Sequence, residues 1–189
     1  YKASQQIDDN PKAKGWKDHP MGTLLTFERS KALAGSGRGA KGAEELYKVI
    51  EKARQAPESE QIAALGMSRI GAGACRALSE LSDLTGGEIY SPEIQYHVGI
   101  GYFLRQETEL AIAGYKGVLT AAQTKADRLA WVPKAVKEIG NMLFQQERFL
   151  EAALAYQTVF TEFPNHEGAD DAGRFAVAAS KKAIEQFGE

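Results

Sequence analysis

The stretch Pro133–Pro164, PKAVKEIGNMLFQQERFLEAALAYQTVFTEFP, decides how the rest of the chain is interpreted. Its apolar residues recur at spacings of three and four in two successive runs, which is the period of one face of an α-helix. A short polar break, Gln145 to Arg148, separates the runs, and Pro164 ends the second. Pro133 suits the first turn of a helix, where its missing N–H is not needed. The stretch therefore predicts two helices packed on each other, with these residues on their apolar stripes: Val136, Ile139, Gly140, Leu143, Phe149, Ala152, Ala153, Tyr156, Val159, Phe160 and Phe163.

The same pattern occurs earlier in the chain at an offset of 41 residues, as Pro92 and Pro133 show. Gly99 then corresponds to Gly140, Ala111 to Ala152, Tyr115 to Tyr156 and Val118 to Val159. A helical pair cannot bury its apolar face alone, so internal repeats of this kind predict a stacked array. We expect the extra residues of the longer repeat, 124–130, to form an insert or an extended helix end.

The rest of the chain carries weaker copies of this helix-pair pattern. We expect a polar N-terminal arm at 1–20 and one helical repeat domain at 21–189. Its predicted parts are hairpins at about 21–57, 58–87, 91–123 and 131–164, with a closing helix at 167–187. Within the second hairpin, residues 58–71 are predicted to be helical, with Ser59 as the N-cap.

The chain resembles the tetratricopeptide repeat (TPR) family, whose unit is a helix–turn–helix of about 34 residues. Four residues of the last full repeat match the family pattern: the small Gly140, then Ala152, the aromatic Tyr156 and the final Pro164. The resemblance implies an all-α fold, a right-handed α-solenoid of about four antiparallel helical hairpins with a closing C-terminal helix. The phrase VFTEFPNHEGADDAGRFAVA is also similar to bacterial envelope TPR proteins of the TolA-binding and outer-membrane assembly lipoprotein type, which favours a periplasmic or envelope location over the cytoplasm.

The same resemblance implies a non-enzymatic adaptor that binds a protein or peptide partner in a concave groove lined by the first helix of each repeat. An ammonium and an amide one helical turn apart, Lys137 and Asn141, could hold a carboxylate or a peptide backbone. The alternatives are a solvated polar face, an oligomerising scaffold, and a regulatory domain of a larger enzyme. The expected groove residues are Tyr96, Ile100, Phe103, Lys134, Lys137, Asn141 and Phe144.

Composition supports this class of function. The formal net charge of −2 supplies no excess of Lys and Arg for nucleic acid. The sequence has no apolar run of the length that spans a bilayer, so we expect no membrane insertion. It has one cysteine, Cys75, and therefore no intramolecular disulfide. Homo-oligomerisation is compatible with this composition.

The sequence contains no complete motif for phosphate binding, metal binding or catalysis. The loop Gly35–Gly42, GSGRGAKG, lacks the Gly-Lys-Ser/Thr of a phosphate-binding loop and follows a helical pattern, which favours an interhelical turn. The histidines His19, His97 and His166 have no partner at metal-binding spacing. We therefore expect no cofactor, no metal and no enzymatic activity.

Overall fold

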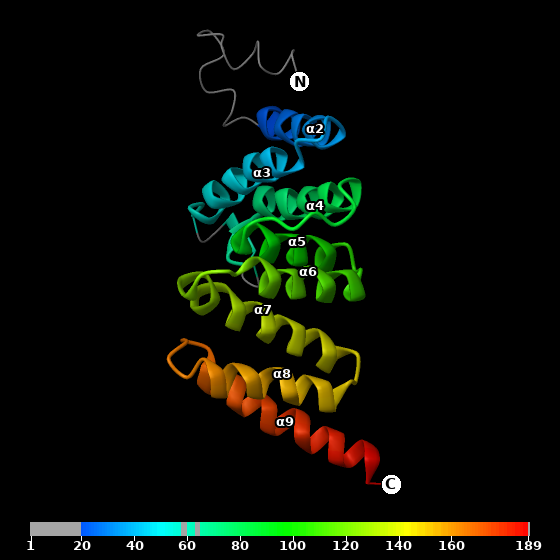
Figure 1. Ribbon diagram of the computed structural model, residues 1–189, viewed down its shortest axis with the longest axis vertical. Helices are drawn as coiled ribbons and strands as arrows, with labels where there is room; N and C mark the ends of the chain where they lie inside the picture. Colours follow the sequence, from blue (N-terminus) through cyan, green and yellow to red (C-terminus); the bar gives the residue numbers. More distant parts are fainter. Residues whose placement is uncertain (1–19, 58–59, 63–64, 189) are drawn as a thin grey trace. The chain divides into compact units, whose positions relative to one another are not determined.

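The computed structural model describes residues 20–57, 60–62 and 65–188. Within these ranges the chain is almost entirely α-helical, with one two-stranded ribbon (Figure 1). The fold class predicted from the sequence, all-α, is therefore confirmed. The predicted arm lies outside the described residues, apart from Pro20, which is the first residue of α2.

The chain divides into two compact units, and each is described by itself. Unit 1 comprises the chain up to Tyr90 together with Ile100–Gln106. Unit 2 comprises Ser91–Gly99 and the chain from Glu107 onward. One helix, α5 (Pro92–Leu104), contributes its first part to unit 2 and its last turn to unit 1.

Unit 1 is built on α2 (Pro20–Gly35), α3 (Gly39–Arg54) and α4 (Arg69–Leu84). The predicted turn in GSGRGAKG joins α2 to α3: Gly37 has a φ of 74°, and Arg38 N–H donates to the Leu33 carbonyl at 2.9 Å. A left-handed glycine in this position is a common helix C-terminus. The helices enclose a core of fully buried aliphatic side chains, Leu33, Leu46, Ile50, Leu78 and Leu81.

The prediction of a helix over 58–71 is wrong. Strands β1 (Gln61–Ile62) and β2 (Met67–Ser68) pair in antiparallel fashion there, and α4 begins only at Arg69. Gly66, at a φ of 58°, closes the turn between them, with its N–H bonded to the Ile62 carbonyl. The Gln61 side-chain amide donates to the Ala56 carbonyl at 2.7 Å, so the segment caps the C-terminal end of α3 instead of starting a helix. The predicted cap Ser59 lies outside the described residues.

The last turn of α5 is fastened to α4 by polar contacts. The Tyr102 hydroxyl donates to Asp83 Oδ1 at 2.7 Å, and Arg105 Nη1 donates to Asp83 Oδ2 at 2.8 Å. Gly101 permits this close approach, because a Cβ there would overlap the Cys75 carbonyl oxygen. Burial together with the acidic partner raises the pKa of Tyr102 to about 12, so its phenol stays a donor.

Unit 2 continues from the first part of α5 through α6 (Thr108–Ala121), α7 (Lys125–Gln145), α8 (Phe149–Glu162) and α9 (Ala169–Phe187). Helices α6 and α7, α7 and α8, and α8 and α9 pack on each other in succession (Figure 1). The closing helix predicted at 167–187 is present as α9.

Pro133 lies inside α7, so the prediction that it occupies the first turn of a helix is wrong. The helix begins at the cap Thr124, whose hydroxyl accepts from Asp127 N–H at 3.0 Å. Residues 125–130 are thus a helix extension, one of the two outcomes expected for the insert. Proline in a helix interior removes one backbone hydrogen bond; the carbonyl concerned belongs to Leu129, whose side chain is exposed.

The two best sequence repeats pack in the same way. In each, the ring of a tyrosine lies against a glycine of the preceding helix, Tyr115 on Gly99 and Tyr156 on Gly140. A Cβ on either glycine would come within 2.8 Å of a ring carbon, closer than atoms normally pack. The 41-residue correspondence found in the sequence is therefore also a correspondence in packing.

Candidate functional site: the α7 face

The predicted groove residues do not form one continuous set. Ile100 and Phe103 belong to unit 1, whereas the other five belong to unit 2. Ile100 is only 7% exposed, so its assignment to a groove is wrong: it packs in the core. Phe103 is exposed.

In unit 2, Lys134 and Lys137 lie one turn apart on α7 and are both half-buried. Lys134 Nζ lies 4.9 Å from the centroid of the Trp131 ring, within cation–π range. Lys137 Nζ reaches the start of α9, 3.5 Å from the position that a Gly168 Cβ would occupy. Within the described part of the chain, neither ammonium group has a carboxylate within ion-pair distance.

His166 lies beside these lysines, in the loop between α8 and α9. Its Nδ1 accepts from Gly168 N–H at 3.1 Å, which orients the ring. Burial lowers the pKa of His166, and the ammonium groups of Lys134 and Lys137 lower it further, against an opposing effect of Glu167. We call these three side chains, with Trp131, the α7 face.

Tyr96 borders this face from α5. Its ring centroid is 5.8 Å from that of Trp131 and 5.4 Å from that of Tyr115. His97, its neighbour, is fully buried, and its ring centroid lies 6.4 Å from that of Trp131. His97 is therefore a packed core histidine.

Asn141 and Phe144 are occupied by contacts within the fold. The Asn141 amide donates to Glu138 Oε2 at 3.1 Å and accepts from the Tyr156 hydroxyl at 2.8 Å. Burial raises the pKa of Tyr156 to about 12, so this phenol stays protonated and keeps donating. The Phe144 ring packs edge-on against Phe149, with centroids 5.1 Å apart. Asn141 thus positions α8, and pairing it with Lys137 as a carboxylate clamp would cost that contact.

Trp131 and His166 were missed as site residues. A signal for Trp131 was present, since it stands three residues before Lys134 and so shares its helix face once α7 is known to start at Lys125. No sequence signal could place His166, because only the turn after Pro164 brings it beside α7.

The groups gathered at the α7 face are cations and aromatic rings, which suit binding of an anionic segment. No group of His, Cys, Asp and Glu among the described residues is arranged to hold a metal ion. None of the described helices combines the length and apolarity required to cross a bilayer. Comparison of the chain with family models, curated proteins and solved structures found no match.

Proposed function

We propose that this protein is a non-enzymatic interaction module of the TPR-like kind, a right-handed solenoid that binds an acidic segment of a partner protein on the α7 face. The repeated packing of Tyr115 on Gly99 and of Tyr156 on Gly140 supports the repeat architecture. In this arrangement α5, α7 and α9 are the first helices of successive repeats, which are the ones expected to line a groove.

The observation that carries the binding proposal is a pair of ammonium groups, Lys134 and Lys137, for which the described part of the chain supplies no carboxylate within ion-pair distance. Both are half-buried: Lys134 lies over the Trp131 ring, and Lys137 Nζ lies near the start of α9. Because partial burial restricts these side chains, a ligand carboxylate would lose less conformational entropy in pairing with them than with fully exposed lysines. The positive end of the α9 dipole lies at the same place and also favours negative charge.

The surrounding groups define the partner chemistry more closely. The Trp131 ring lies beside Lys134, and the centroid of the Tyr96 ring is 5.8 Å from that of Trp131. The two rings together offer an apolar surface next to the cations. A segment that alternates acidic and apolar side chains would fit this arrangement. The partner sought is therefore an acidic, amphipathic peptide and not a nucleic acid.

The test is fluorescence anisotropy of a labelled peptide of alternating Glu and Leu, with one of alternating Lys and Leu as a charge control. Partly exposed ion pairs contribute about 0.2–1 kcal/mol each, and reversal adds repulsion. Lys134→Glu with Lys137→Glu is therefore expected to weaken binding about tenfold, while the far-UV circular dichroism stays unchanged.

The matched control is Lys116→Glu with Lys125→Glu, which makes the same charge change at two exposed lysines of unit 2. Its affinity should stay within about twofold of the unmodified protein, since distant exposed charges are largely screened. Equal losses in the two double variants would mean that the peptide senses only net charge, and the assignment to the α7 face would then be rejected.

A further inference from the structure

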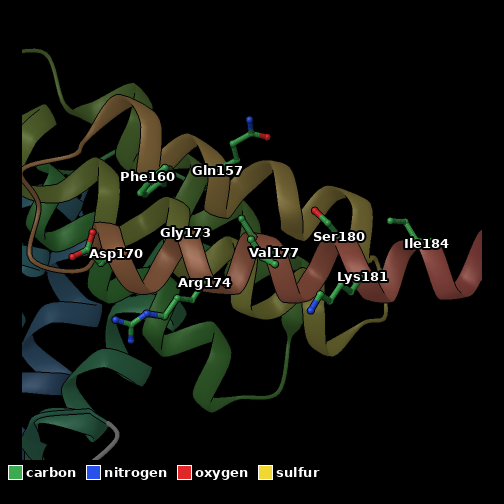
Figure 2. Close-up of a pocket in the computed structure, with 10 residues that line it drawn as sticks. Gln157, Phe160, Asp170, Gly173, Arg174, Val177, Ser180, Lys181 and Ile184 are labelled. Atoms are coloured by element: carbon green, nitrogen blue, oxygen red, sulfur yellow. The ribbon is translucent and has the colours of Figure 1, made fainter.

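A second surface of unit 2 lies between α8 and α9, apart from the α7 face. It is a groove of about 700 Å³, drawn in Figure 2. Large apolar side chains on it face solvent: Phe160 is 47% exposed, Val177 58% and Ile184 71%. Scattered apolar residues are normal on a protein surface, but apolar side chains gathered in one groove indicate an interaction site.

Small residues form the floor of the groove. Gly173 lies directly under the Phe160 ring, where a Cβ would come within 2.9 Å of a ring carbon. Ala176 follows one turn later on the same lining. The Phe160 ring covers Gly173, and the short side chain of Ala176 beside it is where another helix can approach the α9 backbone, toward the 8–10 Å spacing of packed helices.

Charges on α9 distinguish between possible occupants. Arg174 Nη1 is already paired with Asp171 Oδ1 at 3.3 Å, and Lys182 Nζ with Glu185 Oε2 at 2.9 Å. Asp170 and Lys181 line the groove, and in the described part of the chain neither has an ion-pair partner.

Asp170 and Lys181 cannot neutralise each other. They are eleven positions apart, or about 16 Å along a helix that rises 1.5 Å per residue. In Figure 2 Asp170 stands near one end of the groove, and Lys181 lies toward the other. A second α9 lying antiparallel would present an ammonium opposite Asp170 and a carboxylate opposite Lys181 at the same time.

We propose that the groove is the interface of a two-fold symmetric homodimer, in which α9 of one copy packs antiparallel on α9 of the other. The two-fold axis passes beside Ala176, midway between Asp170 and Lys181. Each Asp170 then meets Lys181 of the partner copy, and each Val177 packs on the aliphatic part of the Arg174 side chain of the partner copy, beside the axis. Such an interface is self-complementary and closed, so it stops at two copies.

The α8 side of the groove joins the same interface. With the axis perpendicular to the helices, Phe160 of each copy adds apolar surface along one edge, while the Asp170–Lys181 pairs lie at the two ends of the helix contact. The α7 face is not used, so peptide binding there and dimerisation through the groove are separable.

The test is sedimentation equilibrium of the whole chain over a concentration series. Val177→Lys places a positive charge opposite Arg174 of the partner copy and is expected to raise the dimer dissociation constant at least tenfold. Because Val177 is largely exposed, the fold should be unaffected, which far-UV circular dichroism verifies. A protein that is monomeric at every concentration, or a dimer indifferent to Val177→Lys, would overturn the proposal.

Charge reversal tests the antiparallel register. Asp170→Lys alone places two like-charged pairs in the dimer, as does Lys181→Asp alone, and each is expected to weaken association. An equimolar mixture of the two variants restores both opposite-charge pairs and should dimerise as the unmodified protein does. Failure of the mixture to recover would contradict the proposed arrangement.

Lys182→Asp is the matched control, since Lys182 neighbours Lys181 but does not line the groove. It should leave the dissociation constant within about twofold. If Lys182→Asp weakened association as much as Lys181→Asp, the effect would reflect net charge and the proposed pairing would be wrong. A groove that instead takes a helix from a different protein leaves the purified chain monomeric, which the concentration series detects.

Discussion

The contact between Gly140 and Tyr156 predicts a specific steric cost for Gly140→Ala. A Cβ on Gly140 would lie 2.8 Å from Tyr156 Cε1 and 2.9 Å from Cδ1. Carbon atoms in contact prefer about 3.5–4.0 Å, so the ring or the helix must move by roughly 0.7–1.2 Å. The Tyr156 ring cannot yield freely, because its hydroxyl is bonded to Asn141.

Overpacking of this kind costs about 1–3 kcal/mol. The substitution also gains up to about 1 kcal/mol, since alanine is the better helix former. The two effects can be separated by repeating Gly140→Ala in a Tyr156→Leu background, where the ring is absent. There the steric cost disappears and the substitution is expected to be neutral or stabilising, giving a coupling energy of about 1–3 kcal/mol between the two positions.

Urea unfolding followed by tryptophan fluorescence provides the measurement. The chain has two tryptophans, so a Trp16→Phe background leaves Trp131 of unit 2 as the sole reporter. The m-values should agree among the four proteins, so that midpoints convert to free energies. If Gly140→Ala has the same effect in both backgrounds, the reasoning from close packing is refuted.

Two further predictions concern titratable groups. The lowered pKa of His166 means that the unfolded chain binds a proton at this residue more readily than the folded chain does. The contribution of His166 to stability is therefore present above the ordinary histidine pKa of 6.5 and is lost as pH falls through the lower pKa of the folded protein. Urea midpoints measured from neutral to mildly acidic pH should show a slope that His166→Asn reduces, and an unchanged slope would contradict this. Burial raises the pKa of the Cys75 thiol to about 12, and its side chain is fully enclosed; labelling with a thiol-reactive disulfide should therefore be slow in the native protein and fast in urea, and rapid native labelling would show that unit 1 opens readily.

The helical elements of unit 2 were largely predictable because their apolar period is regular. Gly99, Gly140, Tyr115 and Tyr156 stand at equivalent positions in the sequence and make equivalent contacts in the structure. The closing helix was predicted within two residues at its start. In these regions local preference and tertiary packing favour the same structure.

Two segments were mispredicted for different physical reasons. The sequence pattern predicted a helix start at Pro133. Thr124 and Asp127, three residues apart, already provide the N-cap of this helix, and their spacing is a signal visible in the sequence. Residues 58–71 have helix-compatible composition, but Gln61 is needed to satisfy carbonyl groups at the end of α3. This hydrogen bond joins residues only five positions apart, but the apolar period on which the prediction rested carries no information about a bond between a side chain and the backbone.

The site was predictable only in part. The helical period predicted Lys134 and Lys137 one turn apart on a single helix, and both are half-buried residues of α7. It placed Ile100 on the same kind of face, yet Ile100 is buried, since neighbouring elements decide which sides of α5 are covered. Asn141 was predicted as a ligand-binding residue, and its bond to Tyr156 depends on a helix that sequence spacing cannot orient in detail.

The shared helix α5 has a consequence for dividing the protein into fragments. Its first part belongs to one unit and its last turn, with Tyr102 and Arg105, to the other. A cut in the loop before Pro92 would deprive unit 1 of the partners of Asp83, and a cut after Gln106 would deprive unit 2 of Tyr96 and Gly99. Recombination or truncation that respects both cores must therefore duplicate this helix, so the gene segment encoding it cannot serve as a simple boundary between two transferable modules.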